Sequence, residues 1–199
     1  MMFRKTVPAV AVSLLVCCVA AMGQRALPTA TQPLQFSGFG GVAGVSTGLA
    51  GDNNVDVLVG ADLGLPPVRG VRPVLEVRGA YPMYRGNVDW QKSILGGIKA
   101  DFLLNHRLRP YGDFLLGRGE VHYRGAGYQF GPLVYQLSST NVYSYGGGFE
   151  QDLSDGFALR VDGQIQKWGY APTPSGNVYA KVLNAALVYR FHFGQPYRR

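Results

Sequence analysis

The chain has 199 residues, of which 47% are hydrophobic, 12% aromatic and only 16% charged. This length and apolar content predict one folded domain and exclude a disordered chain, which lacks the apolar surface needed to offset chain entropy. The formal net charge of +7 comes mostly from single Arg and Lys residues spread along the sequence, so no basic block is present to follow a phosphate backbone. We therefore expect no nucleic-acid partner.

The first 23 residues have the pattern of an export signal. Arg4 and Lys5 form a short positive head, residues 7–20 are apolar, and small residues lead to a cleavage site after Gly23. An uncleaved anchor is the alternative, but the apolar stretch contains Pro8 and is shorter than the roughly 20 residues of a spanning helix. Both cysteines lie within this signal, so cleavage predicts an exported protein without disulfides or thiolate metal sites.

Residues 24–33 are polar, contain prolines and show no periodicity, which predicts a periplasmic lead-in. From Leu34 onward, apolar and polar residues alternate in segment after segment, with turn residues between the segments. Period-two alternation is typical of β-strands, and a tilted strand needs about 9 to 11 residues to cross a bilayer, which most of these segments reach. We predict eight strands, at residues 36–47, 55–64, 71–81, 91–103, 110–123, 141–151, 157–168 and 178–193.

The strand at 157–168 shows the alternation most clearly. Phe157, Leu159 and Val161 fall on one face, whereas Arg160 and Asp162 fall on the other. A helix would not produce this division, because it would place Leu159 on the far side from Phe157. The first and fifth strands cannot be assigned faces, since the first is too rich in glycine and the fifth carries charges on both parities.

The polar faces of the strands carry charges of both signs. In a soluble barrel of the lipocalin kind these faces would point to water, with the apolar faces inside. In a membrane barrel they line the lumen, because an Arg facing the bilayer midplane costs about 2 to 4 kcal/mol. The export signal, the strand lengths and the aromatic strand ends favour the membrane barrel. Its predicted lumen set is nearly balanced in charge and is therefore expected to close the interior by salt bridges: Asp56, Asp62, Arg72, Glu76, Arg78, Lys99, Asp101, Glu150, Arg160, Asp162 and Arg190.

Short and long connections alternate along the chain. Tight turns are expected at residues 65–70, 104–109 and 152–156, and longer loops at the opposite strand ends. This asymmetry is typical of outer-membrane barrels. The long loop Arg124 to Thr140 contains three aromatic residues that predict either an exposed binding surface or an interfacial girdle: Tyr128, Phe130 and Tyr135.

The strand count, the sequence RPYGDFLLG in the fifth strand and the closing sequence ALVYRFHF resemble the small eight-stranded outer-membrane barrels typified by the transmembrane domain of outer membrane protein A and by outer membrane protein X. The resemblance covers residues 34–193. It implies an all-β, eight-stranded, antiparallel, up-and-down transmembrane β-barrel, surrounded by the lipid of a bacterial outer membrane.

The end of the last strand is similar to the C-terminal signal of this family. Tyr189, Phe191 and Phe193 match the alternating residues that the barrel-assembly machinery reads. The resemblance therefore implies that this machinery and periplasmic chaperones are partners during biogenesis. In the family the signal normally ends the chain, whereas residues 194–199 follow here as a tail.

The sequence predicts no catalytic, cofactor-binding or metal-binding site. A few barrels of this size are lipid-modifying enzymes with a His-Ser pair near the last strands, but no serine lies within a dozen residues of His192. The run at residues 146–148 lacks the lysine and the strand-to-helix context of a phosphate loop, which favours a strand interior. Three functions stay open: a structural or adhesive barrel acting through its loops with a closed polar lumen, a narrow channel for ions or small solutes, and a lipid-modifying enzyme. We favour the first.

Overall fold

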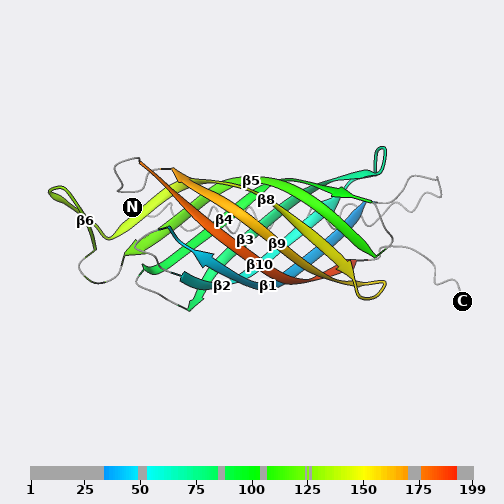
Figure 1. Ribbon diagram of the computed structural model, residues 1–199, viewed down its shortest axis with the longest axis horizontal. Helices are drawn as coiled ribbons and strands as arrows, with labels where there is room; N and C mark the ends of the chain where they lie inside the picture. The colour runs from blue at the N-terminus through cyan, green and yellow to red at the C-terminus, as the bar shows by residue number, and fades with distance from the viewer. Residues whose placement is uncertain are drawn as a thin grey trace, which may run out of the picture. The chain divides into compact units, whose positions relative to one another are not determined.

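The computed structural model describes residues 34–48, 53–84, 88–103, 107–123, 125, 127–169 and 176–191. Within them, eight long strands form a closed antiparallel barrel (Figure 1), which confirms the predicted fold class. The predicted signal (1–23), lead-in (24–33) and tail (194–199) lie outside the described residues. The barrel strands are β1 (Gln35–Ser46), β2 (Asn53–Gly64), β3 (Val71–Tyr84), β4 (Val88–Phe102), β5 (Leu108–Tyr123), β8 (Leu137–Asp152), β9 (Phe157–Gly169) and β10 (Asn177–Phe191).

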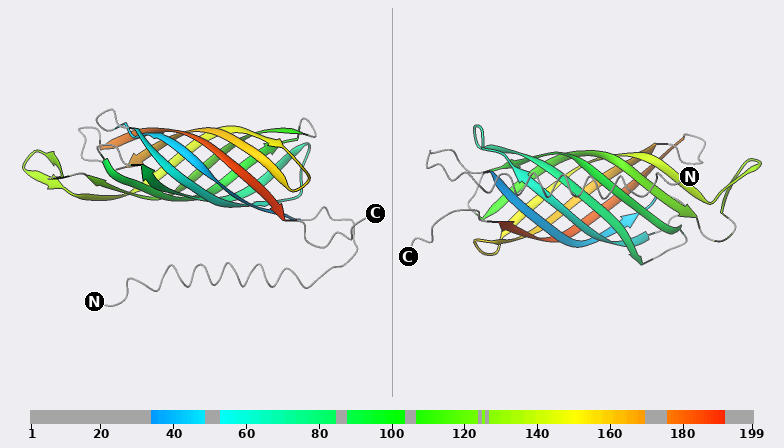
Figure 2. Two further views of the ribbon diagram at one scale, coloured as in Figure 1. Left: turned by 90° about the horizontal axis from the view of Figure 1, so that it is seen from below. Right: turned by 180° about the vertical axis from the view of Figure 1, so that it is seen from behind.

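The barrel has up-and-down topology. Each strand pairs with the barrel strand before it and the barrel strand after it, and β1 pairs with β10 to close the sheet, as the two further views show (Figure 2). Closure pairs the backbone groups of both terminal strands, which a bilayer requires because it offers no water to unpaired N–H and C=O groups.

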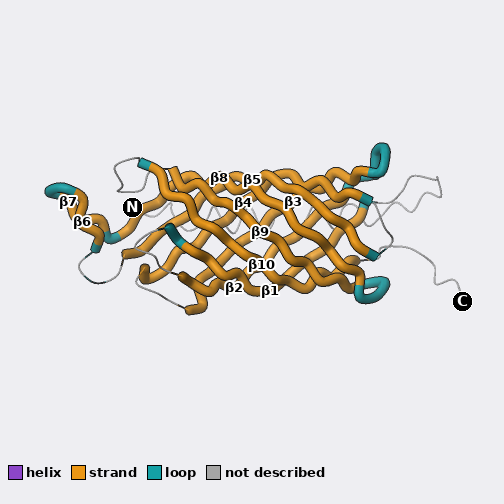
Figure 3. Tube along the Cα trace, in the orientation of Figure 1, coloured by secondary structure: helices purple, strands orange, loops and turns teal. Residues whose placement is uncertain are grey.

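A small hairpin interrupts the long loop between β5 and β8. It consists of β6 (Tyr128–Phe130) and β7 (Leu133–Tyr135) and extends beyond the end of the barrel (Figures 1 and 3). The sequence did not predict it, because each strand has only three residues. Gly131 turns the hairpin with a φ of 61°, in the left-handed region that favours glycine. Because β8 begins at Leu137, the loop is also shorter than the predicted Arg124 to Thr140.

The structure assigns faces to the two strands that the sequence left open. In β1, Phe39, Ala43 and Val45 are buried in the barrel interior. In β5, Asp113 points inward, whereas Arg118 points outward. No bulge separates the two β5 residues, because the pairing with β4 shifts only near Val88. The mixed charges of β5 therefore lie at different depths of the barrel and on different faces.

The outer surface of the barrel is apolar over much of its height. Val59, Ile98, Leu116 and Leu183 all point outward, and Leu183 is 65% exposed. A soluble barrel would place such side chains inside, since water-soluble monomers rarely expose large continuous apolar patches. The apolar exterior is therefore the lipid-facing surface. No helix among the described residues is long and apolar enough to cross a membrane.

Aromatic side chains gather on the outside of the barrel at the end that carries the short turns. Phe36 and Phe191 lie 5.3 Å apart between ring centroids, and Tyr189 lies 5.1 Å from Phe157 and 4.9 Å from Phe191. Aromatic girdles of this kind mark the interfaces of outer-membrane barrels. Phe193 lies outside the described residues, and the use of Tyr189 and Phe191 as an assembly signal stays a prediction.

A charge placed at mid-height on the lipid face should destabilise the barrel. Leu187 points outward in β10, roughly midway along the apolar stretch of that strand. We expect Leu187→Arg to lower the free energy of unfolding from phosphatidylcholine vesicles by about 2 to 4 kcal/mol, and Tyr179→Arg, near the loop end of the same strand, by about 0 to 1 kcal/mol for the charge. Urea titration followed by tryptophan fluorescence measures both, and equal losses would contradict a lipid-facing midplane.

Candidate functional site: the barrel lumen

The predicted lumen residues all occupy inward-facing positions of their strands. Ten of the eleven lie at mid-height or in the half of the lumen nearest the short turns. Buried side chains from several strands form one network of ion pairs there, which we call the charge layer. Asp56 is the exception and lies closer to the loops. The register of the strands creates this layer, because inward residues of neighbouring strands are placed side by side.

Arg160 lies at the centre of the charge layer and is fully buried. Its guanidinium forms ion pairs with Glu150 at 2.6 Å, with Glu76 at 3.6 Å and with Asp62. These three acids come from β8, β3 and β2. One side chain of β9 thus connects four strands across the lumen.

Lys99, which lies in β4, also forms ion pairs with two of these acids. Its ammonium group lies 3.0 Å from Asp62, 2.9 Å from Glu150 and 3.3 Å from Asp101. Because Lys99 and Arg160 share Asp62 and Glu150, cations and anions alternate around the centre of the lumen. Each buried charge is therefore compensated by opposite charges.

Arg78 holds the side of the charge layer that faces the loops. Its guanidinium lies 2.5 Å from Glu76, 3.1 Å from Asp113 and 3.2 Å from Asp162. Asp162 also accepts a 2.9 Å hydrogen bond from the Tyr111 hydroxyl. Glu150 and Asp162 thus both form ion pairs with arginines.

Two arginines close the charge layer toward the short turns. Arg109 and Arg190 both contact Glu150, at 3.4 Å and 3.1 Å, and both lie 2.7 Å from Asp152. Arg72 lies at the same end and donates a hydrogen bond to Gln35.

Aromatic rings support the central cations. The Arg160 guanidinium lies 4.1 Å from the centroid of the Phe39 ring, and the Lys99 ammonium lies 4.8 Å from that of Tyr111. Such cation–π contacts are worth most where water is excluded. Gly60 makes room for the ring, because a Cβ at that position would lie 2.2 Å from a Phe39 carbon.

Several members of the network were missed from the sequence. Asp113 and Tyr111 belong to β5, whose faces could not be assigned, and Arg109 and Asp152 were placed in turns. Gln164, on the polar face of its strand, was not singled out because it carries no charge. Its amide donates hydrogen bonds to Asp113 at 2.8 Å and to Asp162 at 2.9 Å. The sequence did contain a signal for the β5 residues, because Tyr111 and Asp113 are two positions apart and therefore lie on the same face of the strand.

The half of the lumen that faces the loops is less polar than predicted. It contains buried polar side chains such as Gln91, Thr140 and Gln166. Its other inward side chains form a hydrophobic cluster, here called the apolar layer: Ala43, Val45, Leu95, Leu115, Val121, Tyr123, Val142, Trp168, Val178, Ala180 and Val182. Trp168 fits over Gly119, where a Cβ would lie 2.1 Å from its ring. Apolar residues on both faces of a strand weaken the alternation, which is why the sequence did not reveal this layer.

Asp56 lies among the residues around the apolar layer, apart from the ion pairs. It is 2% exposed, and its Oδ1 atom has no hydrogen-bond partner among the described residues. A small cavity beside it is lined by polar side chains that include Gln91 and Gln166. The prediction that Asp56 belongs to the salt-bridge network is therefore not met within the described residues.

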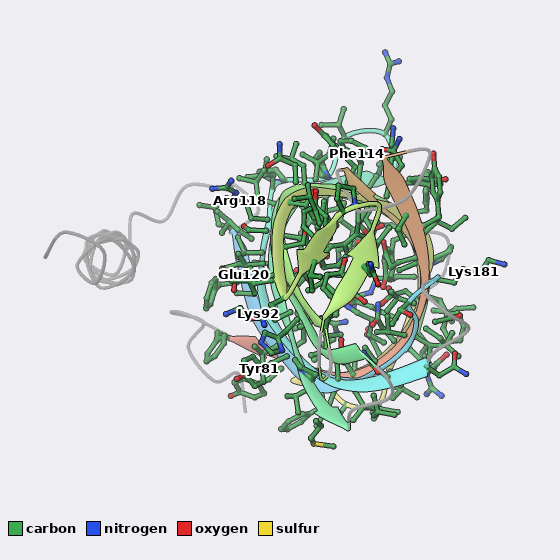
Figure 4. The ribbon with its side chains drawn as sticks, turned by 90° about the vertical axis from the view of Figure 1, so that its left-hand side faces the viewer. Tyr81, Lys92, Phe114, Arg118, Glu120 and Lys181 are labelled. Atoms are coloured by element: carbon green, nitrogen blue, oxygen red, sulfur yellow. The ribbon has the colours of Figure 1, made fainter. Side chains whose placement is uncertain are left out.

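Side chains project into the lumen from the surrounding strands, as the view from the loop end shows (Figure 4). A cavity beside Arg78 and Trp168 and another beside Lys99 and Arg109 have volumes of about 10 Å³ each. A single water molecule needs about that much space. The charge layer and the apolar layer thus form two consecutive barriers along the lumen.

The predicted loop aromatics do not share one environment. Tyr135 is half-buried and packs against the apolar layer. The backbones of Tyr128 and Phe130 belong to β6, and their side chains lie outside the described residues. Leu133 and Val134 of β7 are the exposed apolar side chains of the hairpin.

Among the described residues, no cluster of three or more His, Cys, Asp or Glu side chains is arranged to hold a metal ion. His122 is described, whereas His106 and His192 lie outside the described residues. Gly146 and Gly148 lie in the interior of β8, where an added Cβ would meet the backbone of β9 at 2.1 Å. The interpretation of this glycine run as a strand interior is confirmed.

No protein-family model matches the sequence, and no curated protein matches it. The structure resembles solved outer-membrane barrels. Neisserial surface protein A is 14% identical, with 79% of this chain and 97% of that protein covered and a TM-score of 0.51. The attachment invasion locus protein Ail of Yersinia pestis is 14% identical, with 80% and 100% covered and a TM-score of 0.51. The chain thus has the fold of the small outer-membrane barrels, which together with its apolar exterior places it in a bacterial outer membrane.

Removing the central cation should destabilise the barrel strongly. Arg160→Met leaves Glu150, Glu76 and Asp62 with one compensating cation fewer in a buried site, and we expect a loss of about 3 to 5 kcal/mol in the free energy of unfolding. Lys167→Met, which removes an outward cation from the same strand, should change it by less than about 1 kcal/mol. Urea unfolding in phosphatidylcholine vesicles compares them, and similar effects would show that the charge layer is not the stabilising element.

Asp56 should behave differently from the acids of the charge layer. Asp56→Asn removes a buried charge without breaking an ion pair among the described residues, so the free energy of unfolding should stay unchanged or rise. Asp162→Asn weakens the contact with Arg78 and should cost about 1.5 to 3 kcal/mol. The same urea titration tests both, and a larger loss for Asp56→Asn would mean that its carboxylate has a stabilising partner.

Proposed function

We propose that this protein is a closed, non-catalytic outer-membrane barrel that acts through the surface of its long loop. The observation that carries the proposal is the pair of barriers in the lumen. The charge layer blocks the half near the short turns, and the apolar layer blocks the half near the loops. A solute would have to displace both layers to pass.

The arrangement of charge also argues against a selective channel. Selective pores line their constriction with rings of like charge that bind an ion and release it. Here the charges alternate, and cations such as Lys99 and Arg160 are already held by acids within 3.0 Å. The charge layer therefore offers no free set of one sign along a conduction path.

Among the described residues, the β6–β7 hairpin offers a surface to a partner. Leu133 and Val134 are each more than half exposed on a segment that extends past the barrel end (Figures 1 and 3). Exposed apolar residues close together in a loop mark interaction sites more often than chance exposure does. Tyr135 anchors the base of the hairpin by packing on the apolar layer. A binding or adhesive role through this loop accounts for both the closed lumen and the hairpin.

Single-channel recording in planar bilayers tests the closed lumen. We expect no steady conductance from the folded protein, because the two cavities described in the lumen are each of the size of a single water molecule. A variant that lacks residues 127–136 should also stay closed, since both barriers are built from barrel strands. A steady conductance in the unmodified protein would overturn the proposal in favour of the channel, and conductance only in the shortened variant would place the barrier in the loop.

A further inference from the structure

Four cations point outward from the barrel at the same distance from its short-turn end. They are Lys92 in β4, Arg118 in β5, Lys167 in β9 and Lys181 in β10. In each of these strands, ten residues separate the cation from an outward apolar residue at the short-turn end. The pairs are Lys92 and Phe102, Arg118 and Leu108, Lys167 and Phe157, and Lys181 and Phe191. We call these four residues the cationic belt.

The spacing places the cationic belt at one edge of the lipid-facing surface. Ten residues of a strand that rises about 3.3 Å per residue and tilts by about 40° span roughly 25 Å along the barrel axis. The apolar band of an outer-membrane barrel has about this height. The belt therefore lies where hydrocarbon gives way to lipid headgroups, on the side that carries the long loops.

The belt consists of two pairs on adjacent strands. Arg118 is paired across the strands with Ile94, which puts it diagonally opposite Lys92, and Lys167 is diagonally opposite Lys181 in the same way. Diagonal neighbours lie roughly 7 to 8 Å apart. Viewed from the loop end, Lys92 and Arg118 project from one side of the barrel, and Lys181 projects from the other (Figure 4).

Only one acid offsets the belt among the described outward side chains at this edge. Glu120 lies 2.8 Å from the ammonium of Lys92. Arg118, Lys167 and Lys181 form no ion pair with any described residue, and Arg118 and Lys181 are exposed. The belt thus carries an uncompensated positive charge, in contrast to the balanced charge layer inside.

A groove runs down the lipid-facing wall from Arg118 and Lys92. It has a volume of about 310 Å³ and is lined mainly by apolar atoms, with Val57, Val59 and Ile94 as walls. Gly79 forms part of its lining and carries no side chain to fill it. The groove is therefore an apolar channel on the outer wall whose charged end holds Arg118 together with the Lys92–Glu120 ion pair.

We propose that the cationic belt binds the phosphate groups of an anionic lipid in the loop-side leaflet, with one acyl chain in the groove below Arg118. The occupant is a lipid because the groove faces hydrocarbon, where neither free phosphate nor a polar macromolecule can reach it. Its headgroup is anionic because Arg118, Lys167 and Lys181, which form no ion pair with a described residue, stand at the level where lipid phosphates lie. A guanidinium matches a phosphate through two parallel hydrogen bonds, which makes Arg118 the principal contact.

Native mass spectrometry can test the proposal on the protein folded in vesicles of phosphatidylcholine with phosphatidylglycerol. We expect the released barrel to retain phosphatidylglycerol in preference to phosphatidylcholine, and Arg118→Gln to weaken this preference about fivefold, the value of one cation near an anionic surface. Arg118→Lys should keep part of it. Arg107→Gln removes an exposed cation at the short-turn end and serves as the matched control with no expected effect.

The outcomes are distinct. Loss of the preference in Arg118→Gln and in the double variant Lys167→Gln/Lys181→Gln, but not in Arg107→Gln, supports the belt. Equal retention of both lipids, or an equal effect of Arg107→Gln, overturns it. Competition by inorganic phosphate at moderate concentration would show that the cations bind free anions instead, and this too would overturn the proposal. Each variant is first shown to be folded by its heat-modifiable mobility on a gel.

Discussion

Closure of the sheet between β1 and β10 sets the width of the lumen, and the rest of the structure depends on that width. The bilayer provides no partner for backbone groups, so both sheet edges must pair with each other, as they do from Phe36↔Phe191 to Ser46↔Lys181. Eight strands enclose a space that side chains alone can fill. An inward charge therefore has to find its partner among other inward side chains, as Arg160 does in Glu150.

The charge layer and the apolar layer solve this packing problem in different ways. Apolar side chains such as Trp168 fill space without needing partners. In the charge layer, each strand must place its charged residue at the same height in the lumen as its ion-pair partners, because the partners of Arg160 come from β2, β3 and β8. A one-residue slip of β9 would turn Arg160 toward lipid and leave buried acids without a cation. The charge layer thus favours one register strongly, whereas the apolar layer alone would tolerate exchange among residues of similar size.

The sequence was sufficient to predict the eight strands and most of their faces, because lipid on one side and lumen on the other impose period-two alternation. It was insufficient where that contrast is lost. Inward Leu95 and Leu115 look the same in sequence as outward leucines, so the apolar layer was not foreseen. In β5, Arg118 lies at the edge of the lipid-facing surface, where an outward charge carries little penalty, and it obscured the inward parity of Asp113. Ion-pair partners could not be read from sequence, since they depend on register around the whole barrel.

The two faces of the barrel wall differ in their balance of charge. The net charge of +7 is not concentrated in the lumen, where acids and bases nearly compensate each other. Most of the net charge comes from residues outside the described ones. On the outer face of the described strands, however, cations outnumber the described acids at the level of Lys92, Arg118, Lys167 and Lys181. Burial forces charges to balance because an unpaired buried ion is costly. Exposure at a headgroup region allows them to remain unbalanced, provided that the surrounding lipid supplies the counter-charge. The same two rules, applied on opposite sides of one sheet, thus produce an interior of paired charges and a basic rim.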